Sequence, residues 1–161
     1  MNAGADRARG EILLFLHADT LLPEAADALI IDGLKRARRS WGHFDVRIDG
    51  RHPLLRAVER LMNARSRLTG IATGDQAIFV TRTLFTATGG FPDIPLMEDI
   101  ELSKRLKRFG APLCLNHRIV TSGRRWQKRG VLRTILLMWG LRLAYSLGAD
   151  PRRLAVRYGS R

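Results

Sequence analysis

The chain has 161 residues, the size of one ordinary domain with room for a hydrophobic core. Its hydrophobic share of 45% and charged share of 27% exclude an intrinsically disordered protein, and no apolar run is long enough to span a bilayer. The single cysteine, Cys114, excludes an internal disulfide and a cysteine-based zinc site. The first residues lack the basic and apolar regions of a signal peptide, so we expect a cytoplasmic protein.

The net charge of +13 is concentrated in the C-terminal part of the chain. Residues 1–101 carry 13 Lys or Arg and 14 Asp or Glu, whereas residues 102–161 carry 15 Lys or Arg and only one acid, Asp150. Such asymmetry is typical of proteins that bind nucleic acid, an acidic membrane surface or a phosphorylated substrate. A solvated basic face is the alternative, because Arg outnumbers Lys 24 to 4 and an arginine-rich composition inflates the charge.

The first predicted elements are a short helix over residues 1–9 and a strand over residues 12–16. The strand is a continuous apolar run, which predicts burial on both faces, as in a parallel sheet. His17 and Asp19 follow at its carboxyl end, where ligands bind in such sheets. On an extended chain their side chains point the same way, so they can together hold a divalent metal or a polar ligand. Alternatively, this polar tip only opens the loop to the next helix.

The rest of the chain alternates helices and strands at first and then becomes irregular, which indicates an α/β protein. The strand expected over residues 42–49 alternates apolar and polar residues, so we expect one of its faces to be exposed. The helix after that strand places Leu54, Val58, Leu61, Met62 and Leu68 on one side. The expected elements are a helix over residues 23–39, a strand over 42–49, a helix over 54–68, a strand over 77–80, a helical turn over 83–88, a helix over 98–109, strand pieces over 113–115 and 118–121, and helices over 131–147 and 149–158.

Two pairs of polar residues in the middle of the chain can carry chemistry. Glu98 and Asp99 open a helix after a glycine-rich loop, and a carboxylate there can accept a proton from a substrate hydroxyl. The alternative is that acids in a first helical turn only favour the helix dipole. Asp75 and Gln76 precede a strand, where they can bind a hydroxylated ligand or order the turn.

A basic stretch near residue 125 is the last candidate. Arg124 and Arg125 stand beside Trp126, and paired guanidinium groups suit a diphosphate or an anionic head group. The alternative is a basic loop with the indole packed below it. The glycine-rich pieces of the chain match neither the phosphate loop of NTPases nor the dinucleotide-binding fingerprint, which excludes those two classes.

The order and context of these pieces resemble a family 2 glycosyltransferase, most closely the subgroup of arsenosugar-biosynthesis-type glycosyltransferases. The pieces are an apolar strand ending in His-Ala-Asp-Thr, Gly-Asp-Gln at a strand start, Gly-Gly-Phe-Pro with Met-Glu-Asp-Ile-Glu-Leu, and Arg-Arg-Trp. The resemblance covers nearly the whole chain. It implies a GT-A-like mixed or parallel sheet flanked by helices, with a partial catalytic domain over residues 1–130. The C-terminal apolar helix and basic tail, residues 131–161, would pack on that domain or on a membrane surface.

The resemblance also implies a role for each candidate residue. Asp19 would hold Mg²⁺ or Mn²⁺ against the diphosphate of a nucleotide-sugar donor, and His17 stands where the family has another acid. Asp99 would be the general base of an inverting transfer, with Glu98 beside it. The residues implied on the acceptor side and around the phosphates are Asp75, Gln76, Arg124, Arg125 and Trp126. Ser122 replaces the Gln of the family's Gln-x-x-Arg-Trp motif, which argues against processive polymer synthesis.

Members of that family begin with further β-α units that cradle the nucleoside base, and nothing in this chain matches them. We therefore expect an N-terminally truncated glycosyltransferase that lacks the first β-α units and has impaired donor binding. The expected partners are a nucleotide-sugar donor and a small-molecule or lipid-linked acceptor.

Other functions remain open for the basic C-terminal part. In the predicted helix over residues 131–147, Arg133 and Arg142 lie on opposite faces, so the apolar residues between them need cover from the domain or from lipid. Flanking arginines favour peripheral contact with an anionic membrane, at its inner face for a cytoplasmic protein. A non-enzymatic Arg-rich nucleic-acid-binding module is the rival class, but an apolar helix interrupts the basic stretch, so nucleic acid is not an expected partner. A metal-dependent hydrolase that uses Asp19 and Asp99 is the third alternative.

Overall fold

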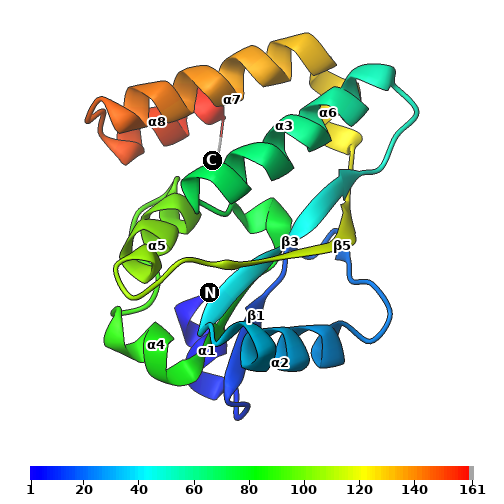
Figure 1. Ribbon diagram of the computed structural model, residues 1–161. Coiled ribbons are helices and arrows are strands. Elements are labelled where there is room, and N and C mark those ends of the chain that lie inside the picture. Colours follow the sequence, from blue (N-terminus) through cyan, green and yellow to red (C-terminus); the bar gives the residue numbers. More distant parts are fainter. Residues whose placement is uncertain (160–161) are drawn as a thin grey trace.

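The computed structural model describes residues 1–159, and of Arg125 and Arg129 it describes the backbone only. It is an α/β protein with a mixed sheet of five strands, strongly curled into a half-barrel and flanked by helices (Figure 1). The elements in chain order are α1 (Asn2–Arg7), β1 (Ile12–Phe15), β2 (Thr20–Leu21), α2 (Ala26–Ala37), β3 (Trp41–Ile48), α3 (Pro53–Thr69), η1 (Gly74–Gln76), β4 (Ile78–Thr81), α4 (Arg82–Ala87), α5 (Glu98–Lys107), β5 (Leu113–Thr121), α6 (Arg124–Arg129), α7 (Val131–Ser146) and α8 (Pro151–Tyr158).

The order of the strands explains why the sheet curls. The order is β1-β4-β3-β5-β2, in which only β3 and β5 run parallel. Thus β1 and β2 lie at opposite ends of the sheet, although only residues 16–19 separate them in the chain. This link turns back on itself, because the Thr20 N–H donates to the His17 carbonyl at 3.1 Å. So short a connection draws the two ends of the sheet together.

The first strand is not the parallel, central strand that its apolar run predicted. β1 pairs antiparallel with β4 and lies at one end of the described sheet. The prediction that both of its faces are covered is confirmed, because Leu13 and Phe15 belong to one core cluster while Ile12 and Leu14 pack against another. The apolar run therefore indicated two covered faces, and carried no information on strand direction.

The strand predicted to be half exposed is the middle strand of the sheet, β3. Of its polar positions, His43 is buried, Asp45 is half-buried and Arg47 is exposed, while polar side chains of α3 bond the backbone of β3. Glu59 accepts the N–H of Ile48 at 2.6 Å, and the Asn63 side chain bonds both the N–H and the carbonyl of Val46, at 2.9 and 3.1 Å. The predicted exposure therefore holds at Arg47 and fails at His43, which is buried.

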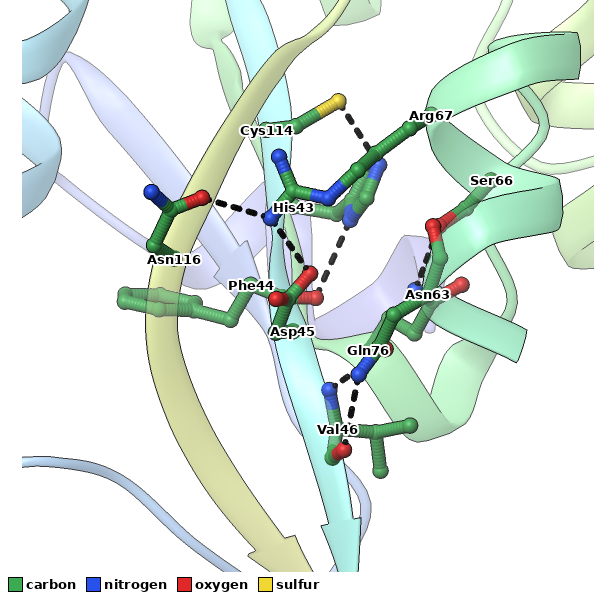
Figure 2. A network of polar contacts seen from close by, with 10 residues as sticks. All are labelled: His43, Phe44, Asp45, Val46, Asn63, Ser66, Arg67, Gln76, Cys114 and Asn116. Carbon is green, nitrogen blue, oxygen red and sulfur yellow. Dashed lines mark hydrogen bonds and ion pairs between the residues drawn. The ribbon is translucent and has the colours of Figure 1, made fainter. Parts of the chain in front are cut away.

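Figure 2 shows how this polar layer continues along β3. Arg67 of α3 pairs with Asp45 at 2.8 Å and donates to Asn116 Oδ1 at 2.7 Å. His43 is fully buried, and its Nδ1 donates to the carbonyl of the next residue at 3.0 Å. Its Nε2 is then left to accept from the Cys114 thiol, 3.3 Å away. Burial lowers the pKa of His43, so the neutral ring is favoured.

The leucine pattern of α3 predicted the helix but not its buried side. Leu55 and Val58 are buried, whereas Leu54, Leu61 and Leu68 are exposed. The face of α3 that meets the sheet includes polar side chains with paired atoms, so apolar residues alone did not mark it. The result is a helix with a partly polar buried face.

Helices cover the sheet on both sides. In Figure 1, α2 lies on the side of the sheet away from α3 and α7, and it contributes Ile30 and Leu34 to a core cluster with Phe44 and Phe79. On the next layer, α7 packs on α5 and α8 through Leu141, which is buried. Whether residues 131–161 form a separate unit from residues 1–130 stays a prediction.

Several smaller differences concern the ends of elements. The helix expected from residue 23 begins at Ala26, and the two strand pieces after residue 112 are one strand, β5, with an irregularity in its register with β3. The short strand β2 and helix α6 were not predicted. None of the described helices is both long and apolar enough to cross a membrane.

Candidate functional site

A pocket of about 620 Å³ opens where the 16–19 link, the loop before β4, the start of α5, the end of β5, and helices α6 and α7 meet. Seven of the eight candidate residues whose side chains the structure describes line this pocket. They are His17, Asp19, Asp75, Glu98, Asp99, Arg124 and Trp126. Segments that are far apart in the chain therefore contribute to one cavity.

His17 and Asp19 reach the pocket by a different route from the one predicted. They do not follow each other on an extended strand, because β1 ends at Phe15 and the chain turns. The His17 Nδ1 lies 3.5 Å from a carboxylate oxygen of Asp75, and this hydrogen bond raises the pKa of His17. The ring packs so closely on Gly74 that a Cβ at that position would overlap Nε2. The structure thus pairs His17 with a carboxylate.

Asp99 ties the loop before β4 to helix α5. Its Oδ2 accepts the Gly74 N–H and its Oδ1 accepts the Ile100 N–H, both at 2.7 Å. Burial raises the pKa of Asp99, and these two hydrogen bonds oppose the rise. A carboxylate whose pKa is raised in this way is better able to accept a proton from a substrate hydroxyl.

Glu98 lines the same pocket as its neighbour. It is half-buried, and burial raises the pKa of its carboxyl group as well. The helix that carries both acids begins after Met97, a buried residue with a φ of 70°. A positive φ is uncommon for a residue with a side chain, and such conformations are concentrated at functional sites. This turn sets the first residues of α5 at the pocket wall.

Gln76 is the described candidate that does not line the pocket. Its side chain is fully buried, donates to Ser66 Oγ at 2.9 Å and accepts the Thr73 N–H at 3.3 Å. It therefore holds the loop before β4 against α3. Asp75, beside it, has a side chain 44% exposed and faces the pocket.

The basic stretch around Trp126 forms helix α6 rather than a loop. Trp126 is half-buried and packs with Ile48, Val58 and Met62, while Arg124 is exposed. The side chain of Arg125 lies outside the part of the chain that the structure describes. Among the described side chains of this stretch, Arg124 and the indole of Trp126 line the pocket.

Two arginines near the pocket were missed by the sequence analysis. Arg142 of α7 lines it. The pKa of Arg65 of α3 is lowered to about 10, first by its own burial and then by the nearby charge of Arg142. The Nε and Nη2 of Arg65 and the Nε of Arg142 are buried, with no hydrogen-bond partner among the described residues. Unpaired buried donors are rare in folded proteins and mark sites for water or an anion. The available signal was an arginine at position 142 in the most apolar stretch of the chain, on the face opposite Arg133.

A metal held by protein side chains alone does not fit this pocket. In the described part of the chain, no group of three or more His, Cys, Asp or Glu side chains is placed to hold an ion. A Mg²⁺ ion usually needs only one or two carboxylates together with substrate phosphates. Asp19, exposed at the pocket wall, can supply one such carboxylate.

Comparison with known proteins adds no assignment to this pocket. No protein-family model matches the chain, and no curated protein matches it. The chemistry of the lining itself combines carboxylates, guanidinium groups and an indole. Such a combination can bind an anionic group and, beside it, a hydroxyl group that gives up a proton.

Proposed function

We propose that this protein is a family 2 glycosyltransferase with a GT-A-like fold, which transfers a sugar from a nucleotide-sugar donor to a hydroxyl acceptor with inversion. The observation that most supports it is the convergence of four separate segments on one pocket, which they line with His17 and Asp19, Asp75, Glu98 and Asp99, and Arg124 and Trp126. Acids that only cap helices or order turns have no reason to share a cavity. Residues that handle one substrate do.

The cations of the pocket suit the leaving group of this reaction. Breaking the bond between the anomeric carbon and a nucleoside diphosphate builds negative charge on the leaving oxygen. Arg124 and Arg142 both line the pocket, and the buried Nε of Arg142 lacks a partner in the described structure. In this proposal they bind the diphosphate, with Trp126 beside them.

Asp19 is the residue proposed to hold Mg²⁺ or Mn²⁺ together with diphosphate oxygens. When bound, the ion neutralises charge on the leaving diphosphate. His17 faces Asp75, so its proposed task is to position that carboxylate on the acceptor side.

Asp99 is the proposed general base. It takes the proton of the acceptor hydroxyl, whose oxygen forms the new bond to the anomeric carbon while the bond to the diphosphate breaks on the opposite face. The raised pKa of Asp99 favours this proton transfer. Glu98 lines the same pocket and is the alternative base.

Calorimetric titration of UDP and of GDP, each with and without Mn²⁺, into the purified chain tests the donor site. Donor binding is expected to be weak, and we expect the nucleotide binding that remains to require Mn²⁺ and to be lost in Asp19→Ala. Asp32→Ala, which removes an exposed acid of α2, is the matched control and should bind as the parent does. Nucleotide binding that does not depend on Mn²⁺, or that is unchanged in Asp19→Ala, would overturn the proposal.

The identity of the general base can be tested separately with any nucleotide-sugar donor that the protein uses for transfer. Asp99→Asn should lower transfer by about 10²–10⁴-fold, the usual contribution of a general base, while leaving nucleotide binding in place. Glu98→Gln should have a much smaller effect. The reverse result would assign the base to Glu98.

A further inference from the structure

Helix α7 carries a row of apolar side chains on its outer surface. Leu132, Leu136, Trp139, Leu143 and Leu147, which we call the outer row, recur every three or four residues and so share one face of the helix. They are exposed by 65%, 73%, 61%, 62% and 80% of their surface. Contiguous exposed apolar surface of this kind marks an interaction site.

The opposite face of α7 already has its packing partner within the protein. Thr134 and Leu141 are buried there, and Leu141 clusters with Ile100 and Leu154. Tyr145 on this inner face donates to a Glu101 carboxylate oxygen at 3.2 Å. Figure 1 shows α7 at the outside of the molecule, with α3 on its inner side. The outer row is therefore left over after the helix has docked on the domain.

Basic residues surround the outer row in sequence, and acids are nearly absent. Between residues 122 and 159 the one acid is Asp150. The exposed basic side chains described in this stretch are Arg124, Lys128, Arg133, Arg152, Arg153 and Arg157. Exposed leucines and an indole near basic side chains suit a helix that lies in the interface of an anionic bilayer.

We propose that the outer row of α7 binds the surface of an anionic membrane, with the helix axis in the plane of the interface. The leucines enter the boundary of the acyl chains, Trp139 sits at head-group level, and the surrounding arginines meet lipid phosphates. A second copy of this chain is a poorer occupant, because pairing two outer rows brings two basic surrounds together. No described helix can cross a bilayer, so contact is with one surface.

The same helix links this surface to the pocket. Met138 and Arg142 line the pocket from α7, while Trp139 and Leu143 belong to the outer row. Membrane binding thus holds the pocket close to the lipid surface. If the chain is the glycosyltransferase proposed above, on which this one point rests, the acceptor hydroxyl belongs to a lipid or a lipid-linked molecule.

Co-sedimentation of the full chain with phosphatidylcholine vesicles, with and without phosphatidylglycerol, tests the proposal. We expect binding at low salt to the vesicles that contain phosphatidylglycerol, and loss of binding in high salt and with phosphatidylcholine alone. No sedimentation with anionic vesicles at low salt would overturn the membrane proposal and leave the sugar-transfer proposal untouched.

Two matched variants separate insertion of the outer row from charge attraction alone. Trp139→Ser should reduce the bound fraction several-fold, whereas Phe109→Ser, at a residue 63% exposed after α5, should not change it. Both sites are exposed, so unchanged circular dichroism is expected for each. Equal binding by Trp139→Ser and the parent chain would overturn the proposal. The outer row would be assigned to a second copy of the chain by a different result. In that case the parent chain elutes as a dimer and does not bind vesicles, and the Trp139→Ser variant elutes as a monomer.

Discussion

Helix α3 buries charged side chains on two of its faces, and the two faces differ in how those charges are paired. On the face toward β3, Glu59 accepts the Ile48 N–H and pairs with Arg56 at 2.9 Å. On the face toward α7, Arg65 stands near Arg142, and buried N–H groups of both lack partners among the described residues. One helix therefore carries both a completed polar interface and an incomplete one.

This difference in pairing distinguishes side chains that hold the fold together from side chains that are available to a ligand. An unpaired buried donor costs about 1–3 kcal/mol, so folded proteins keep few of them unless a ligand or water completes the set. The β3 face of α3 needs nothing further and holds the sheet. The α7 face borders the pocket, and under the proposed function a bound anion completes it. Variants on the two faces should therefore behave in opposite ways.

The largest expected effect is on the completed face. Glu59→Ala removes the partner of Arg56 and leaves the buried Ile48 N–H unpaired, so we expect the free energy of unfolding to fall by about 2–4 kcal/mol. Glu59→Gln keeps one acceptor and should lose less. Urea denaturation measures both, with Glu24→Ala, at an exposed acid before α2, as the control. A loss no larger than that of the control would remove the distinction between the faces.

The incomplete face should respond in binding and hardly at all in stability. Arg65→Gln and Arg142→Gln each remove a buried charge that has lost its water, so the free energy of unfolding should stay within about 0.5 kcal/mol of the parent or rise. Binding of nucleotide with Mn²⁺ should weaken about tenfold or more, because a hydrogen bond to a charged group is lost. Arg133→Gln, on the exposed side of α7, is the control. Destabilisation as large as that of Glu59→Ala would show that Arg65 belongs to the framework.

The completed face should also make stability depend on pH through His43. Its folded pKa is lowered by burial, so below about pH 6.5 the unfolded chain binds a proton that the folded chain does not. Stability should therefore fall as the pH drops from about 6.5 toward the folded pKa, by at most about 1.4 kcal/mol per pH unit.

Unfolding curves between pH 7.5 and 5 measure this dependence. His43→Gln should be less stable at neutral pH but flatter with pH, whereas His52→Gln, at an exposed histidine, should keep the slope of the parent. The raised pKa of His17 gives a pH dependence of the opposite sign, because its contribution to stability is present at low pH and lost as the pH rises. This contribution is small, since the pair of His17 with Asp75 is exposed. An unchanged slope in His43→Gln would contradict the assignment.

The smallest effect is expected at the rim of the pocket. In Gly74→Ala the new Cβ overlaps the His17 ring, which is exposed and can swing away. Stability should change little, while the hydrogen bond to Asp75 is lost and the pKa of His17 falls toward its usual value. Titration of the His17 ring protons by NMR measures this. Gly140→Ala, where an added Cβ meets nothing, should leave the pKa of His17 unchanged.

The sequence predicted most helices and strands because their patterns are local, and it failed where a pattern has two physical causes. Alternating polar residues predicted that one face of β3 is exposed, which holds for Arg47, but His43 on the same face is buried. The apolar run of β1 correctly predicted two covered faces, and strand direction could not follow from it. Direction depends on which strands pair, and those pairs are distant in the chain.

The candidate site was predicted in composition more than in geometry. Asp19, Asp75 and Asp99 were selected from separate motifs, and the fold places all three at one pocket. Arg65 was not selected because a surface arginine on a helix and a buried one look the same in sequence. Its importance comes from α7 packing over it, a contact between residues far apart in the chain.

The strand order has a consequence for how the chain folds during synthesis. β3 pairs with β5, and Thr20 of β2 pairs with Thr121 of β5, which lies 101 residues later in the chain. β2 therefore cannot pair until β5 has been synthesised. Until that segment leaves the ribosome, β2 and one edge of β3 have no neighbour, and the half-barrel cannot close. Long-range pairing of this kind slows folding and leaves strand edges open to other chains. We therefore expect the domain to fold only once translation has passed β5, as one cooperative unit, and to need protection from aggregation until then.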